Sequence, residues 1–147
     1  MSDVMHNFEM YQPENVEDAV NLLSDFGKDA WVIAGGKDSL DWFKDRVKTP
    51  KAVIDVSELS DLKGIKETSN GVRIGAMTTL TELENHKLIK SMFPGLALAA
   101  SRVASPQIRN VGTIGGNLCQ DTRCHYYRDG FPCYRACLLY TSDAADE

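Results

Sequence analysis

Two glycine motifs stand far apart in this chain, and both contain residues that suit the binding of an anion. They read Ile33-Ala34-Gly35-Gly36-Lys37-Asp38-Ser39 and Asn110-Val111-Gly112-Thr113-Ile114-Gly115-Gly116-Asn117. Paired glycines remove shielding side chains and free the backbone, so successive N–H groups can converge on one anion. Two such turns that close on one ligand suit a pyrophosphate better than a single phosphate. Taken singly, each pair is more typical of a tight turn, and the Rossmann pattern Gly-x-Gly-x-x-Gly is absent from both motifs.

A cluster of cysteines follows the second glycine motif. Cys119, Cys124, Cys133 and Cys137 all lie in the last fifth of the chain. Because the first residues carry charges where a signal peptide would need an apolar segment, we expect a cytoplasmic protein. In that compartment such a cluster is more often a metal or redox site than a disulfide framework, and ordinary buried thiols are the alternative.

The last residues of the chain read Cys-Leu-Leu-Tyr-Thr-Ser-Asp-Ala-Ala-Asp-Glu. This stretch, residues 137–147, resembles a translated sequencing adapter along its whole length. We therefore expect it to be an artefact appended after Ala136, with a genuine short C-terminus as the alternative.

Alternating strands and helices are expected to position the first glycine motif. The pattern predicts strands at 7–12, 31–34 and 52–56 and helices at 16–26 and 39–46. Asn15 is a suitable cap for the first helix, and Gly27 is its stop signal. This order indicates a small layered unit in which helices cover a sheet.

A hairpin and two helices are expected ahead of the second motif. Asn70-Gly71 between strand-like residues 64–68 and 72–76 is a strong hairpin signal. Thr79 and Glu82 have capping-box spacing, so a helix should begin there and run to about residue 85. The Leu- and Ala-rich stretch 94–103 predicts a buried helix that ends at Ser105-Pro106.

Composition excludes some classes of function. The formal net charge of −5 leaves no basic excess for neutralising phosphates, which argues against a general nucleic-acid binder. No run approaches the apolar length that crosses a membrane.

Three segments in order resemble the FAD-binding subunit of the molybdenum hydroxylases. They are residues 33–38, residues 74–80 (Ile-Gly-Ala-Met-Thr-Thr-Leu) and residues 104–117 (Ala-Ser-Pro-Gln-Ile-Arg followed by the second glycine motif). The family includes the medium subunits of carbon monoxide dehydrogenase, xanthine dehydrogenase and 4-hydroxybenzoyl-CoA reductase. The resemblance spans essentially all of residues 1–136.

The resemblance implies a truncated α+β fold of the p-cresol methylhydroxylase and vanillyl-alcohol oxidase type, in which two α/β subdomains hold FAD between them. Residues 1–58 would be the small N-terminal subdomain, and residues 59–136 would be part of the larger one, with a cysteine-rich insertion from residue 118. The expected cofactor contacts are Ala34, Gly35, Gly36, Lys37, Asp38 and Ser39 on one wall and Asn110, Gly112, Thr113, Ile114, Gly115, Gly116 and Asn117 on the other. Lys37 either contacts a phosphate or is solvated, and Arg109 either lies near the flavin or is exposed.

The chain departs from the common family pattern after Asn117, where a small-residue segment usually leads to an Asp beside the ribityl chain. The cysteine-rich segment found here is similar to that of the 4-hydroxybenzoyl-CoA reductase type, which holds a four-iron cluster. Cys119, Cys124 and Cys133 would be three of its ligands, with the fourth beyond Ala136. A zinc site and structural thiols are the alternatives.

The function that the resemblance implies is electron transfer. Substrate would be oxidised at a molybdenum cofactor on a large subunit, and electrons would pass through iron–sulfur clusters on a small subunit to FAD on this chain and then to an acceptor such as NAD. No nucleophile or general base is expected in this chain, because the redox chemistry belongs to the cofactor. A stand-alone FAD oxidase of the same fold and a non-enzymatic metal-binding module are the alternatives, and the fragment alone is expected to be inactive.

Overall fold

A three-stranded parallel sheet organises the first part of the chain in the computed structural model, which describes residues 5–129 and 131. Its strands are β1 (Glu9–Tyr11), β2 (Ala30–Ile33) and β3 (Ala52–Asp55), in the order β1-β3-β2. The side chains of Ala52, Val53 and Ile54 in the central strand are fully buried. This explains the apolar run in the sequence, because a central parallel strand is covered on both faces.

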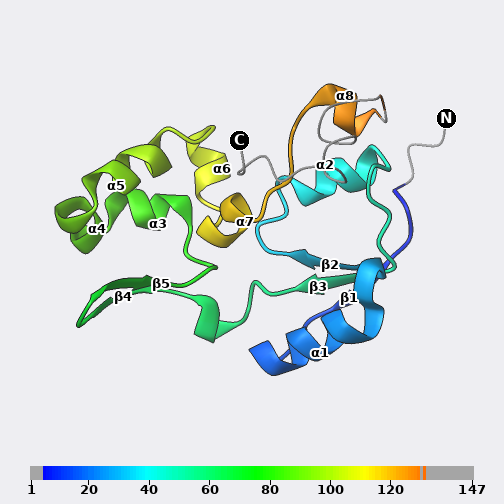
Figure 1. Cartoon of the computed structure of the whole chain (residues 1–147), viewed down its shortest axis with the longest axis horizontal. Coiled ribbons are helices and arrows are strands. Elements are labelled where there is room, and N and C mark those ends of the chain that lie inside the picture. The colour runs from blue at the N-terminus through cyan, green and yellow to red at the C-terminus, as the bar shows by residue number, and fades with distance from the viewer. Residues whose placement is uncertain (1–4, 130, 132–147) are drawn as a thin grey trace, which may run out of the picture.

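Helices cover both faces of this sheet (Figure 1). Helix α1 (Val16–Phe26) packs through Ala19 against the face that carries Ile54. Helix α2 (Ser39–Lys44) packs through Trp42 and Phe43 against the face that carries Val53. Adjacent residues of a strand point to opposite faces, so one short strand anchors two separate cores.

A hairpin backed by helices forms the second part of the chain. It consists of β4 (Ile65–Thr68), β5 (Gly71–Ile74), α3 (Leu80–Asn85), α4 (Lys87–Met92) and α5 (Pro94–Ser101). Leu80, Leu83 and Ile89 are buried between the helices, and the inner face of the hairpin packs against them. The single-turn helices η1 (Gly27–Asp29) and η2 (Ser60–Leu62) join neighbouring elements.

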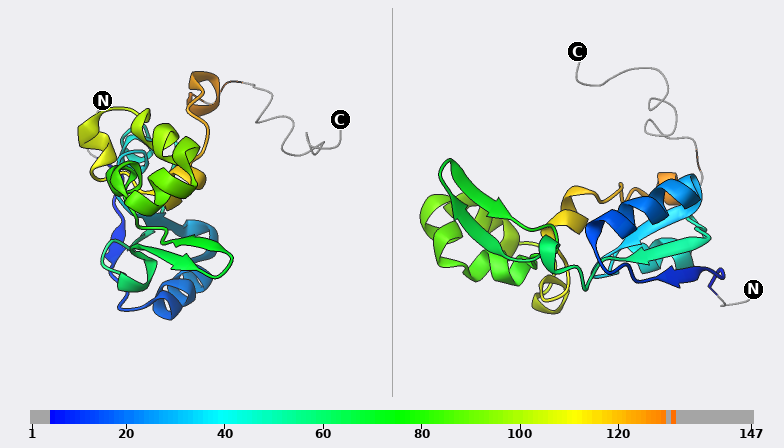
Figure 2. Two further views of the ribbon diagram at one scale, coloured as in Figure 1. Left: turned by 90° about the vertical axis from the view of Figure 1, so that its left-hand side faces the viewer. Right: turned by 90° about the horizontal axis from the view of Figure 1, so that it is seen from below.

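Three short helices carry the chain from α5 back toward the parallel sheet, and the last of them lies over α2 (Figure 1). They are α6 (Pro106–Arg109), α7 (Ile114–Leu118) and α8 (His125–Arg128). Figures 1 and 2 show α7 between the β1–β3 sheet and the α3–α5 helices. The architecture is α+β, as predicted, whereas the subdomain boundary near residue 58 stays a prediction.

The local signals in the sequence had mixed outcomes. Helix 16–26 is confirmed, with the Asn15 side chain accepting from the amide of Asp18, and both halves of the Thr79–Glu82 capping box are present. The hairpin is confirmed, although Gly71 opens the second strand rather than completing the turn. Pro106 was expected to end a helix, and instead it begins α6, since proline is well tolerated in the first turn.

In the described part of the chain, no helix has the length and apolar character that crossing a membrane requires.

Candidate functional site

The two glycine motifs meet at Gly35. A Cβ atom at this position would overlap the carbonyl oxygen and the carbonyl carbon of Val111, with the amide nitrogen of Gly112 next to it. Only glycine therefore permits the loop after β2 to lie directly against the second motif. The structure thus brings together two segments about 75 residues apart in sequence, as expected of two walls around one ligand.

The first motif keeps its backbone donors free. Among the residues that the structure describes, no partner accepts a hydrogen bond from the N–H groups of residues 35–39. Gly36 has φ +71°, a left-handed conformation that turns the chain from β2 into α2. Successive free N–H groups on a loop of this kind form a concave site for an anion, and a pyrophosphate matches that chemistry.

The second motif uses its donors internally. The amides of Ile114 and Gly115 donate to the carbonyls of Thr78 and Ala76 at 2.9 Å each, and those of Gly116 and Asn117 donate to the Thr113 hydroxyl and carbonyl at 3.1 Å each. The Asn117 side chain also donates to the Thr113 carbonyl. In this conformation the second motif therefore contributes a close-packed wall, while the first motif contributes the free donors. Contact between either wall and FAD stays a prediction.

The segment from residue 75 to 80 holds the second motif in place. Thr79 and Thr113 form an isolated antiparallel bridge, and the Leu80 amide donates to the Gly112 carbonyl at 2.9 Å. On the other edge of this segment, the amides of Gly75 and Met77 donate to carbonyls of residues 62–64 at 2.8 Å. The segment that resembled the family thus joins the hairpin to the glycine site.

Asp38 connects the first glycine motif to the cysteine-rich segment. Its carboxylate accepts a hydrogen bond from the Trp42 indole at 3.0 Å and lies 2.9 Å from Arg123 and 3.3 Å from Arg128. The Arg128 guanidinium also lies over the Trp42 ring at 4.3 Å, and Tyr127 meets the edge of that ring. The side chain of Asp38 is therefore engaged within the protein, and its backbone N–H is the group left for a ligand.

These arginines were not found by sequence reasoning. Arg128 is 90 residues from Asp38, so no local pattern connects them. The only local signal was the spacing of Asp38 and Trp42, which lie four residues apart at the start of a short helix and can therefore contact each other.

The Asp38 contacts predict a pH-dependent stability. Burial raises the pKa of Asp38, but the Trp42 hydrogen bond and the charges of Arg123 and Arg128 outweigh it, so the pKa lies below the ordinary 3.8. A depressed pKa means that the ionised carboxylate stabilises the folded state above the unfolded-state pKa, and that this contribution is lost as the pH falls through the folded-state pKa. Asp38→Asn should therefore be less stable than the wild type by about 1 kcal/mol at neutral pH, and the gap should close in strong acid.

Urea unfolding of both proteins from pH 7 down to pH 2 would test this expectation. Asp41→Asn is the matched control, since Asp41 is exposed on the same helix and forms no ion pair with the described residues. A gap that persists unchanged to the lowest pH would show that the carboxylate charge is not what holds the segment.

Two further side chains of the first motif have different surroundings: Ser39 contacts the sheet, and Lys37 is exposed to solvent. The Ser39 hydroxyl accepts a hydrogen bond from the Trp31 indole at 3.0 Å, so it is held by the sheet. Lys37 is exposed and forms no ion pair with the described part of the chain, so the phosphate contact and the solvated side chain both stay predictions.

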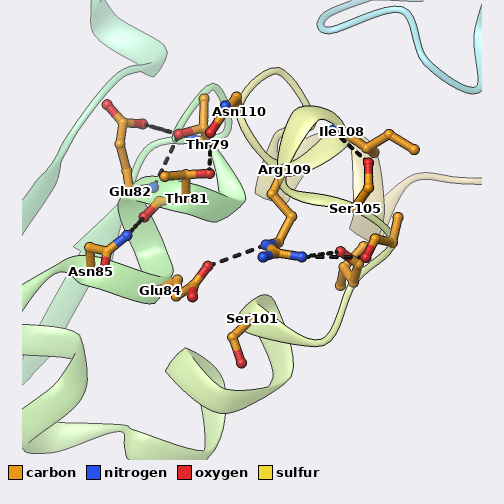
Figure 3. Close-up of polar contacts among 12 residues, drawn as sticks. Thr79, Thr81, Glu82, Glu84, Asn85, Ser101, Ser105, Ile108, Arg109 and Asn110 are labelled. Carbon is orange, nitrogen blue, oxygen red and sulfur yellow. Dashed lines mark hydrogen bonds and ion pairs between the residues drawn. The ribbon is translucent and has the colours of Figure 1, made fainter.

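Arg109 has a structural role that neither expectation described (Figure 3). Its side chain is 13% exposed and lies 3.2 Å from the Glu84 carboxylate, so the expectation of an exposed arginine is wrong. It also donates to the carbonyls of Val103 and Ala104 at 3.0 and 3.3 Å. Arg109 thereby ties the loop before α6 to helix α3.

Asn110 points its side-chain oxygen at helix α3 rather than at the glycine loops. This oxygen accepts a hydrogen bond from the Thr81 hydroxyl at 2.7 Å (Figure 3). Asn110 therefore fixes the approach of the second motif to α3 in this structure.

The cysteine ligands are only partly within the described structure. Cys119 and Cys124 are free and exposed, whereas Cys133 lies outside the described residues, as does Cys137. Within residues 5–129 and 131, no group of three or more His, Cys, Asp or Glu side chains is placed to hold a metal. The three-cysteine ligand set thus stays a prediction.

Comparison with known proteins gives a consistent result. Residues 6–136 match the family described as the FAD binding domain in molybdopterin dehydrogenase. The chain is 46% identical over 116 residues to the nicotinate dehydrogenase FAD-subunit of Eubacterium barkeri, which covers 78% of this chain and 39% of that protein. It is 41% identical over 111 residues to the carbon monoxide dehydrogenase medium chain of Hydrogenophaga pseudoflava. That alignment covers 76% of this chain and 39% of the relative.

Solved structures agree with this match. Carbon monoxide dehydrogenase from Hydrogenophaga pseudoflava superimposes with a TM-score of 0.76 at 40% identity, over 78% of this chain and 40% of that one. Quinoline 2-oxidoreductase from Pseudomonas putida 86 gives a TM-score of 0.74 at 28% identity. This match also covers 78% of this chain and 40% of the other. The chain spans about two fifths of the length of the curated relatives it matches.

Proposed function

The chain belongs to the family of FAD-binding domains in molybdopterin dehydrogenases, and from that premise we propose that it holds the pyrophosphate of FAD between its two glycine motifs. The observation that carries this proposal is the contact of Gly35 with Val111, beside a loop whose amides at 35–39 have no partner among the described residues. These free donors and the exposed Lys37 fit a doubly charged pyrophosphate. The second motif supplies the wall against which the ligand rests.

The proposed activity is that of the FAD-binding electron-transfer subunit of a molybdenum-containing hydroxylase or dehydrogenase in the cytoplasm. Its partners would be a large subunit with the molybdenum cofactor and a small iron–sulfur subunit. When bound, the flavin supplies the redox chemistry that passes electrons to an acceptor such as NAD. The residues of this chain bind and place it, and no proton-transfer residue is required of them.

The proposal extends to the cysteine-rich segment. Cys119, Cys124 and Cys133 would ligate a four-iron cluster together with a fourth ligand beyond residue 136. Two observations support this: the exposed, free thiols of Cys119 and Cys124, and the attachment of their segment to Asp38 through Arg123 and Arg128. That attachment would keep such a cluster beside the flavin-binding loop.

Flavin selectivity tests the proposed function. Titrating the purified chain with FAD, FMN and riboflavin should give FAD the tightest binding, because only FAD carries a pyrophosphate. Loss of two charge-assisted hydrogen bonds predicts binding of riboflavin that is at least about 100-fold weaker. Fluorescence quenching would measure affinity, and circular dichroism would confirm that the chain is folded. Equal affinity for FAD and riboflavin would contradict a pyrophosphate site at these motifs, and iron and sulfide analysis of the anaerobic preparation would check the cluster.

A further inference from the structure

A second cluster of cations lies away from the glycine motifs, on the outer face of the hairpin. Lys66 in β4 and Arg73 in β5 are directly paired across the antiparallel register. Like charges in this position repel each other and destabilise a hairpin. Their neighbours Ile65 and Ile74 face the α3–α5 core, so alternation directs both cations to the opposite face.

No carboxylate lies within ion-pair distance of these cations in the part of the chain that the structure describes. None of its ion pairs includes Lys63, Lys66 or Arg73. All three side chains are exposed. The arrangement therefore keeps three positive charges together without an internal partner, in a chain whose overall charge is −5.

The three cations line one cavity of about 480 Å³ between the hairpin, η2 and the first residue of α1. The cavity is open to solvent and carries several polar and charged side chains, so charge rather than apolar burial would hold a ligand there. Asp61 is the one acidic residue of the lining, so the lining has an excess of two positive charges. A hollow with this excess of positive charge is better suited to a small ligand with several negative charges than to a partner with a flat acidic surface.

The cavity borders the segment that holds the second glycine motif in place. Gly75 lines the cavity, and its amide donates to the carbonyl of Gly64 at 2.8 Å. The next residue, Ala76, accepts from the amide of Gly115 on the other side. The cavity and the second glycine motif therefore both contact the turn at residues 75–78.

From this geometry we propose that Lys63, Lys66 and Arg73 form a second anion site, which binds a small ligand carrying a diphosphate group. The ligand neutralises the Lys66–Arg73 pair and so stabilises the hairpin on which it sits. This site is separate from the pyrophosphate site of the glycine motifs and does not depend on it.

Inorganic pyrophosphate is the probe for this site, and amide chemical shifts of the ¹⁵N-labelled chain are the readout. Saturable shifts should appear at residues 63–66, 73 and 75. Lys66→Glu should weaken pyrophosphate binding at these residues at least about tenfold, the loss expected for one charge-assisted hydrogen bond. It should also stabilise the fold, because glutamate opposite Arg73 replaces repulsion with attraction.

Lys90→Glu is the matched control, since it makes the same charge change at an exposed position of α4 outside the cavity. It should leave pyrophosphate affinity within about twofold of the wild type, because exposed charges far apart are screened. Equal weakening by both variants, or shifts confined to residues 35–39, would overturn the second site. Loss of FAD selectivity with intact shifts at the hairpin would instead contradict only the proposed flavin site.

Discussion

Replacing Gly35 with alanine should strongly weaken FAD binding by this chain. The added Cβ would overlap the Val111 carbonyl oxygen, so the two glycine motifs would have to move apart. Such overpacking costs about 3 kcal/mol where backbone faces backbone, since neither side can rotate away. We expect FAD affinity to fall at least about 100-fold, as the loop can no longer direct its amides at the pyrophosphate. Fluorescence titration with FAD and urea unfolding would measure the two effects.

Alanine substitutions at two other glycines distinguish this steric effect from the effect of backbone strain. Gly36→Ala has room, with the nearest atom a flexible Ile33 side-chain carbon at 3.4 Å, but its φ of +71° should cost about 1–2 kcal/mol. Gly95→Ala, in α5, meets nothing within 4 Å and should stabilise the helix slightly. If Gly35→Ala bound FAD as well as Gly95→Ala does, the contact between the motifs would not form the site.

Arg109→Ala should produce the largest loss of stability among the charged side chains discussed. The substitution removes the ion pair with Glu84 and both hydrogen bonds to the carbonyls of Val103 and Ala104. Because the guanidinium is mostly buried, we expect the free energy of unfolding to fall by about 3 kcal/mol. Urea unfolding monitored by circular dichroism would measure it.

Arg102→Ala is the control for Arg109, because Arg102 is exposed just before the same loop. It should change stability by less than about 0.5 kcal/mol. Glu84→Gln should cost less than Arg109→Ala, since the two carbonyl contacts remain. Equal losses for Arg102→Ala and Arg109→Ala would show that the buried network contributes nothing specific.

Local signals succeeded where a few neighbouring residues decide the structure. Asn15 and Thr79 begin their helices through side chains that cap amides three residues ahead. The four-residue helix α6 and the glycine-rich α7 escaped prediction because isolated helices of that length are unstable in water. Helix α7 instead depends on contacts with residues 76–78, which are distant in sequence.

Residue types and their local order were enough to predict the family, the α+β class and the two glycine motifs as candidate walls of a pyrophosphate site. Three further features became visible only in the folded chain: Gly35 lies against Val111, the second motif uses its amides internally, and Asp38 is paired with Arg128. A backbone amide is free or occupied according to which distant carbonyl packs beside it. That packing depends on the whole fold rather than on the motif.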